Sequence, residues 1–194
     1  MHQYIIIELQ NDIMTYKIKI YPVTTSKFCD VFDENNDLVY SVKSEGIFNS
    51  NYGVYKNNSM IANIECEVKK HNFNNDETSY DIFAYIYKND VQVANMASTM
   101  EFITKKSYTI GGFEYKFSSN LIGTHYEVKN RDKEIIGHVD TNIASSNYVL
   151  NVQNHAGEDI LLSLLMILIY QKSDPNSITN SIIDNIVGNS FKMD

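Results

Sequence analysis

Apolar and polar residues alternate with a period of two over most of the first 153 residues of the chain. In one such segment Ala62, Ile64 and Cys66 lie on one side of an extended chain, and Asn63 and Glu65 lie on the other. This period is typical of β-strands that have one face against a core. The pattern predicts strands near residues 4–9, 14–21, 27–32, 38–43, 51–55, 60–68, 79–87, 91–102, 107–110, 113–118, 123–128, 135–141 and 147–153.

Polar turns join these strands in pairs. An apolar strand end, a stretch rich in Asn and Asp, and an apolar strand start follow one another at residues 32–40, 55–61, 87–93 and 128–136. Asn and Asp tolerate left-handed backbone conformations, so each stretch predicts a hairpin turn. Gly111-Gly112, between two apolar segments, predicts a fifth tight turn. Because the spacing between turns is irregular, the arrangement is a β-meander and not a repeat solenoid.

Aromatic residues are expected on the outside of the sheet as well as on the inside. In the strand at 79–87, Ile82 and Ala84 alternate with Phe83 and Tyr85, so both faces are apolar. The chain has 14 Tyr and 9 Phe but no Trp, and Tyr and Phe suit half-buried pleated surfaces. The composition therefore favours a mainly β protein.

The strands end near Gln153, and residues 160–170 are apolar on every side of a helical wheel. A helix without a polar face must be surrounded. At ~1.5 Å per residue it is about 16 Å long, roughly half the hydrocarbon thickness of a bilayer. Glu158 and Asp159 precede it and Lys172 follows it, with the charges that the helix dipole favours. The segment therefore predicts a core helix enclosed by the sheet, and not a membrane span.

A second, amphipathic helix is predicted after Asp174-Pro175, because proline suits the first turn of a helix. It would pack on the outside of its own domain or on a partner. The apolar positions of this second helix are Ile178, Ile182, Ile183, Ile186 and Val187.

At the start of the chain, the apolar run at residues 4–7 is too short for a signal peptide.

The charge of the chain bears on its partners. It has 16 basic and 24 acidic residues, which gives a formal net charge of −8. A phosphate backbone repels such a chain unless a local basic patch overrides the field. The densest basic runs, Lys69-Lys70 and Lys105-Lys106, are only two residues long. Nucleic acid is therefore not expected as a partner.

Metal and cofactor sites are not expected either. Cys29 and Cys66 are the only cysteines, without a CxxC motif, and Cys66 alternates with apolar residues as a core cysteine would. The low cysteine count fits a reducing compartment and, with no signal peptide predicted, a cytoplasmic location. Histidine ligand spacing such as HxH or HExxH is absent. The five histidines are His2, His71, His125, His138 and His155.

One segment partly matches a calcium loop. Asp33, Asn35 and Asp37 occupy the first three ligand positions of an EF-hand. The match then fails at Leu38, where the loop needs Gly, and at Ser44, where it needs a bidentate Glu. The segment therefore predicts a hairpin turn.

No catalytic residue is assigned from the sequence. The GxSxG, P-loop and GxGxxG motifs are all absent. Glu65 and Glu67 share one strand face, so a pair of catalytic carboxylates like that of a glycosidase is an open alternative. No other feature of the sequence favours it.

Several segments together resemble the LURP-one-related family, which is similar to the tubby C-terminal domain and the phospholipid scramblases. In chain order they are residues 16–19, 32–43, 55–58 and 122–128, and Glu158-Asp159 with its apolar helix. The resemblance implies a closed antiparallel barrel of about twelve strands around a central hydrophobic helix. Closure is also expected on physical grounds, because it removes sheet edges. This barrel domain would span residues 14–172. An N-terminal extension at 1–13, for which an extra strand is one alternative, would precede it, and a C-terminal extension at 173–194 would follow it.

Two functions from different classes follow. The first is a non-enzymatic binding or scaffold protein that recognises an unknown protein partner through the outside of the barrel. The second is a peripheral membrane protein that binds anionic phospholipid or phosphoinositide headgroups, as the tubby branch implies. The scramblase branch implies calcium-linked lipid movement, and the excess of acidic residues departs from the tubby pattern. An enzyme, the third reading, would need a concave pocket with clustered titratable groups.

Overall fold

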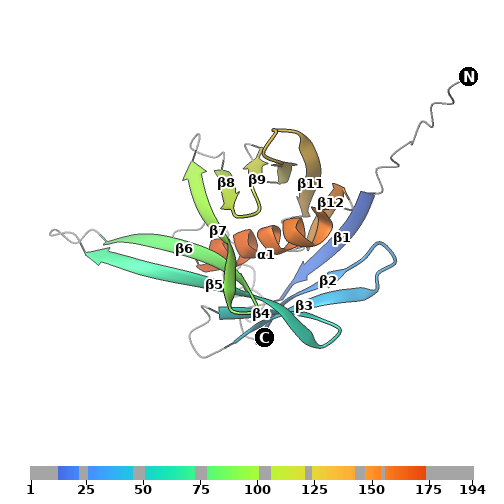
Figure 1. The fold of residues 1–194 in the computed structure, drawn as a ribbon, viewed down its shortest axis with the longest axis horizontal. Helices are drawn as coiled ribbons and strands as arrows, with labels where there is room; N and C mark the ends of the chain where they lie inside the picture. The colour runs from blue at the N-terminus through green and yellow to red at the C-terminus, as the bar shows by residue number, and fades with distance from the viewer. Residues whose placement is uncertain are drawn as a thin grey trace, which may run out of the picture.

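The computed structural model describes residues 13–21, 26–45, 51–72, 78–100, 106–120, 124–142, 147–153 and 156–173. Within these residues the chain forms twelve strands followed by one helix (Figure 1). The strands are β1 (Ile13–Ile20), β2 (Lys27–Phe32), β3 (Leu38–Ser44), β4 (Asn51–Lys56), β5 (Ser59–Asn72), β6 (Thr78–Lys88), β7 (Val91–Met100), β8 (Lys106–Gly111), β9 (Tyr115–Ser119), β10 (His125–Lys129), β11 (Ile135–Asn142) and β12 (Asn147–Gln153). The helix, α1, spans Gly157–Ser173.

Every strand pairs antiparallel with its neighbour in sequence, and β1 closes the sheet on β12 to make a barrel. The closing ladder runs from Ile13 opposite Gln153 to Lys19 opposite Asn147. Across this seam the hydroxyl of Thr15 donates a hydrogen bond to Oδ1 of Asn151, at 2.8 Å. The predicted closed meander is therefore confirmed.

The helix α1 fills the interior of the barrel, with strands on either side of it in Figure 1. All residues from Ile160 to Ile169 are buried, so no side of the helix faces water there. The one polar side chain among them, Ser163, donates from Oγ to the carbonyl of Asp159 at 2.7 Å. Inward positions of the strands, such as Ile64 and Leu150, complete the core. The prediction of a core helix is confirmed.

Of the helical residues that the structure describes, no stretch is long and apolar enough to cross a membrane.

The first turn of α1 is held by charged groups at one end of the barrel. Strand direction alternates, so the hairpins after β2, β4, β6, β8 and β10 all lie at this end. Nζ of Lys88 lies 3.1 Å from Oδ1 of Asp159, and Nζ of Lys56 lies 3.5 Å from Oε2 of Glu158. The Tyr40 hydroxyl donates to the same Glu158 oxygen at 3.2 Å. These contacts attach the N-terminus of α1 to β3, β4 and β6.

The last turn of α1 is held by aromatic residues at the opposite end. Nε2 of Gln171 donates to the Tyr108 hydroxyl at 2.9 Å. Nζ of Lys172 lies over the rings of Phe28 and Tyr52, at 4.8 and 5.8 Å from their centroids. Desolvation holds the pKa of Lys172 below its usual value. A cation at this end also suits the helix dipole.

Asn and Asp shape the hairpins, as predicted. Asn57-Asn58 and Asn89-Asp90 have φ angles between 50° and 63°, which two-residue hairpin loops require. Asn36 also has a positive φ, of 65°, in the turn between β2 and β3.

The turn predicted at Gly111-Gly112 lies further along the chain. Gly111 belongs to β8 and pairs with Asn95 of β7, so that ladder extends to the end of the strand. The turn consists of Gly112, Phe113 and Glu114. Gly112 and Glu114 have φ angles of 88° and 59°. The dipeptide marked the hairpin correctly, but only its second glycine has the conformation that favours glycine.

Two predicted elements, the strand at 4–9 and the second helix after Pro175, lie outside the described residues. The other twelve predicted strands agree with the structure to within a few residues. The largest difference is at β5, which continues to Asn72 and not only to residue 68.

Candidate functional site

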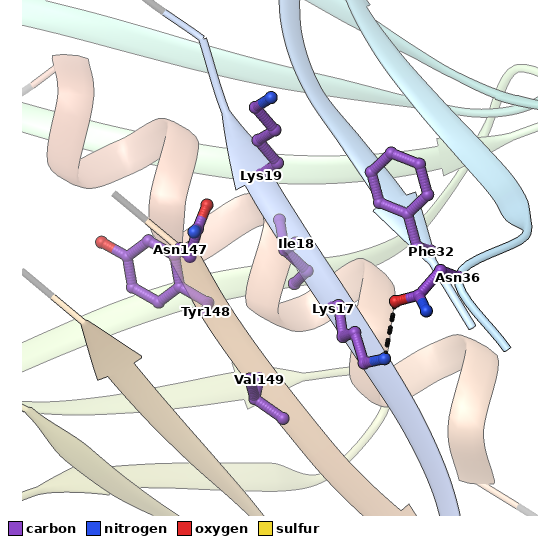
Figure 2. A pocket seen from close by; sticks show the side chains of 8 residues that line it. All are labelled: Lys17, Ile18, Lys19, Phe32, Asn36, Asn147, Tyr148 and Val149. Atoms are coloured by element: carbon purple, nitrogen blue, oxygen red, sulfur yellow. Dashed lines mark hydrogen bonds between the residues drawn. The ribbon is translucent and has the colours of Figure 1, made fainter. Parts of the chain in front are cut away.

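A groove crosses β12, β1 and β2 on the outside of the barrel, at the seam where the sheet closes. Its volume is about 340 Å³, and Figure 2 shows its side chains in place on the three strands and the adjoining hairpin. It is lined by Lys17, Ile18, Lys19, Phe32, Asn36, Asn147, Tyr148 and Val149.

The strand register determines which side chains meet in this groove. Lys17 of β1 lies opposite Val149 of β12 on one side and Phe32 of β2 on the other. Lys19 lies two residues further along β1, and therefore on the same face, opposite Asp30 of β2. The groove thus combines apolar side chains with two lysines, which suits a ligand with apolar and anionic parts.

The ammonium group of Lys17 is positioned by the hairpin between β2 and β3. Nζ donates to Oδ1 of Asn36 at 2.7 Å, the dashed line in Figure 2, and to the backbone carbonyl of Glu34 at 3.1 Å. Both acceptors are neutral, so these two contacts fix the ammonium without cancelling its charge.

Two further lysines lie on the outer face of the neighbouring strands. Lys27 of β2 is the register partner of Lys43 of β3. Strands β1, β2 and β3 together contain four lysines and a single carboxylate, Asp30, although the whole chain has a net charge of −8. A local basic field can attract an anion that the whole-chain charge would repel. We call Lys17, Lys19, Lys27 and Lys43 the lysine face.

Asp30 organises this lysine face. Its Oδ2 accepts a hydrogen bond from the Tyr21 hydroxyl at 2.7 Å and lies 2.6 Å from Nζ of Lys27. Its Oδ1 accepts from the hydroxyl of Ser41 at 2.8 Å. Burial by itself would raise the pKa of Asp30, but these donors outweigh it and the pKa lies below its usual value. The ionised carboxylate therefore neutralises Lys27, and the other three lysines provide the local positive field.

Aromatic rings lie beside two of those lysines. Nζ of Lys19 is 5.5 Å from the ring centroid of Tyr21, and Nζ of Lys43 is 4.9 Å from that of Tyr55. Cation–π contacts of this kind hold the lysine stems along the outer surface while their ammonium groups stay accessible.

The segment that partly matches a calcium loop is a hairpin turn, as predicted. Oδ1 of Asp33 accepts hydrogen bonds from the backbone N–H groups of Asn35 and Asp37, both at 2.9 Å. The carboxylate therefore closes the turn. Among the residues that the structure describes, no three His, Cys, Asp or Glu side chains are grouped to hold a metal ion.

Two of the histidines meet on the outer face of β10 and β11, which the sequence did not indicate. Nδ1 of His125 lies 2.8 Å from Oδ1 of Asp140, and the His125 ring stacks on His138 with centroids 5.4 Å apart. His2, His155 and the side chain of His71 lie outside the described residues.

Both cysteines are buried and unbridged, which confirms Cys66 as a core residue. Burial raises the pKa of the Cys66 thiol to about 12 and also raises that of the Cys29 thiol. Neither is a thiolate at neutral pH, so neither suits nucleophilic catalysis.

Glu65 and Glu67 lie on the outer face of β5, opposite Tyr85 and Phe83 of β6. The ring of Tyr85 lies 6.4 Å from that of Tyr87, its neighbour on the same face. The predicted aromatic coat on the outside of this strand pair is therefore confirmed, and these carboxylates are part of that surface.

Sequence reasoning missed the lysine face, although part of its signal was present. The hairpin between β2 and β3 pairs Phe32 with Leu38 and, five residues further along each strand, Lys27 with Lys43. Lys17 and Lys19 lie next to this pair through the pairing of β1 with β2, a register that no local pattern specifies.

Comparisons with known proteins bear on the fold. No protein-family model matches the sequence, and a search of curated proteins also gives no match. The structure is similar to the X-ray structure of the Arabidopsis thaliana protein AT5G01750, with a TM-score of 0.54 and 12% sequence identity. The match covers 81% of this chain and 90% of the plant chain. At this identity the similarity shows a shared fold.

Proposed function

We propose that this chain is a non-enzymatic binding or scaffold protein of the LURP-one-related type, which holds its partner on the outside of the barrel. The filled interior is the observation that supports this most, because α1 is buried on all sides from Ile160 to Ile169. A ligand can then reach only the outer surface and the two rims. The groove over β12, β1 and β2 is a concave place on that surface.

The LURP-one-related assignment rests on two observations. The segments quoted from the sequence resemble that family, and the resemblance implies a barrel of about twelve strands around an apolar helix. The chain has this architecture. The similar plant structure supports the fold part of the argument.

Substitution in the groove should weaken partner binding. Val149→Asp places a charge in the apolar strip beside Lys17. In affinity capture from an extract of the native cells, this variant should retain at least about tenfold less partner than the unmodified chain, which corresponds to about 1.4 kcal/mol. Val91→Asp is the matched control, because Val91 is 62% exposed on β7, on the opposite side of the barrel. Equal retention by both variants, or no captured partner at all, would contradict the proposal.

A second candidate function is the binding of anionic phospholipid or phosphoinositide headgroups. The lysine face favours it, because Lys17, Lys19 and Lys43 project from neighbouring strands while Asp30 neutralises only Lys27. A lysine near an anionic membrane surface contributes about 1 kcal/mol. Three such lysines would strengthen binding on the order of 100-fold at low salt.

Vesicle co-sedimentation tests this second function. The unmodified chain should pellet at low salt with phosphatidylserine or phosphoinositide vesicles, and not with phosphatidylcholine vesicles. Lys19→Glu/Lys43→Glu should leave most of the protein in the supernatant. Lys69→Glu/Lys133→Glu is the control, since each double variant changes the net charge of −8 by the same four negative charges. Failure of the unmodified chain to pellet with either anionic vesicle would rule out lipid binding and leave the protein-scaffold function standing.

A further inference from the structure

An apolar face is uncovered where the β5–β6 hairpin extends past the end of α1. The two strands pair as far as Asn72 opposite Thr78, and Figure 1 shows them projecting beyond the helix. Cys66 of β5 and Ala84 of β6 face inward and are buried. At the next inward position of β5, Val68 is 43% exposed, although it points the same way as Cys66.

The register partner of Val68 is Ile82 of β6, which is partly exposed on the same face. Val68 and Ile82 therefore continue the apolar lining of the barrel as a strip that no other described element covers. Leaving apolar surface in water forgoes about 25 cal/mol for each Å² that could be buried. A covering segment would recover this free energy.

The chain leaves α1 beside this strip. Ser173, the last residue of the helix, donates from its hydroxyl to the carbonyl of Ile169 at 2.9 Å. Its side chain also lies beside the thiol of Cys66, where it opposes the rise in the pKa of that thiol that burial causes. Because Cys66 and Val68 are neighbours on the same face of β5, the last described turn of α1 ends beside the uncovered strip.

The sequence that follows α1 has apolar residues at helical spacing. Isoleucine or valine occurs at positions 178, 182, 183, 186 and 187, which is helical spacing. A helix over 176–187 would be about 18 Å long, which is more than enough to cover Val68 and Ile82. Pro175 disfavours a continuous helix through Asp174. A change of chain direction at this proline would let the second helix lie along the β5–β6 strand pair.

We propose that residues 176–187 form an amphipathic helix that packs its isoleucine face on Val68 and Ile82. This helix extends the core of the barrel along the β5–β6 hairpin. The occupant is the chain's own C-terminal segment, because it continues from Ser173 at the end of α1, next to the strip. A short tether gives a local concentration on the order of millimolar, which a free partner rarely reaches.

Disulfide trapping in the full-length chain tests the proposal. Val68→Cys combined with Ile182→Cys should form an intramolecular disulfide at micromolar protein concentration. Phe83→Cys combined with Ile182→Cys is the control, because Phe83 is 37% exposed on the same strand pair but alternates with Ile82 and so faces the other way. The docked helix predicts that the first pair forms at least about tenfold faster than the second. Mass spectrometry identifies the bonded pair, since the natural cysteines are buried.

Equal rates for the two pairs would overturn the proposal, because an undocked segment reaches both faces of the hairpin. Disulfide-linked dimers as the main product would overturn it as well, and would assign the strip to a second copy of the chain. Hydrogen exchange on the chain without new cysteines gives an independent readout. Amides of residues 178–187 should exchange at least about tenfold more slowly than in Val68→Asp. Unprotected exchange in the unmodified chain would contradict the docked helix.

Discussion

Leu165→Asp should abolish folding. Leu165 is fully buried in α1 at the centre of the barrel. Losing the leucine side chain costs about 2–5 kcal/mol, and an unpaired carboxylate in that position costs several more. The sum is comparable to the 5–15 kcal/mol of net stability that is typical of a whole domain. Circular dichroism during urea or thermal unfolding should therefore show no cooperative transition.

The matched control for this experiment is Val91→Asp, which introduces the same charge at a site that is 62% exposed. Its free energy of unfolding should stay within about 0.5 kcal/mol of the unmodified value. A soluble Leu165→Asp protein that unfolds cooperatively would refute the central position of α1. The same variant also distinguishes a core helix from a membrane anchor. If the segment were a membrane anchor, adding a charge to it would improve the solubility of the protein.

Gly112→Ala should lower the free energy of unfolding by about 1–3 kcal/mol, the usual cost of backbone strain at one residue. Gly112 has a φ of 88° in the hairpin between β8 and β9. A Cβ atom there would also collide with the backbone carbonyl oxygen of Val93 on β7. Because that oxygen is part of a strand, it cannot move without disturbing the sheet. Chemical denaturation of both proteins measures the difference.

Gly111→Ala provides the comparison. Gly111 has an ordinary strand conformation, and its added Cβ would meet the amide oxygen of the Asn95 side chain, which can rotate away. Its effect should be below about 1 kcal/mol, since replacing glycine by alanine within a strand otherwise stabilises it slightly. If the two substitutions had equal effects, the turn geometry assigned to residues 112–114 would be incorrect.

Local sequence patterns predicted most of the fold because each pattern reflects a local physical requirement. The alternation of Ala62, Ile64 and Cys66 with polar residues identified the inward face of β5, and all three are buried. The pairs Asn57-Asn58 and Asn89-Asp90 marked hairpins because their backbones must adopt positive φ angles. The boundary at Gly111 was misplaced because its pairing with Asn95 of β7, a contact between strands, extends β8 through it.

The candidate site was far less predictable. The pairing of Lys27 with Lys43 follows from one hairpin, because both lysines lie five residues from the pair Phe32 and Leu38 beside the turn. This pairing could be predicted from the sequence. The groove needs β12 beside β1, where Val149 lies opposite Lys17 across more than 130 residues of chain. No local preference specifies such a pairing, because it forms only when the whole meander curls around α1. The stacking of His125 on His138 depends in the same way on the register of two strands.

By itself, the sequence determined the elements of this protein: strands with one apolar face, hairpins with left-handed Asn and Asp, and a helix with no polar side. It also determined that the helix must be enclosed, because an apolar surface on every side leaves no orientation that water tolerates. The tertiary structure decided which outer faces became neighbours. Barrel closure placed a groove at the β12–β1 seam. The registers of β1 with β2 and of β2 with β3 brought four lysines together on an acidic chain. The physical reason is that core burial fixes the inward side chains, whereas the outward ones are placed by strand register and closure.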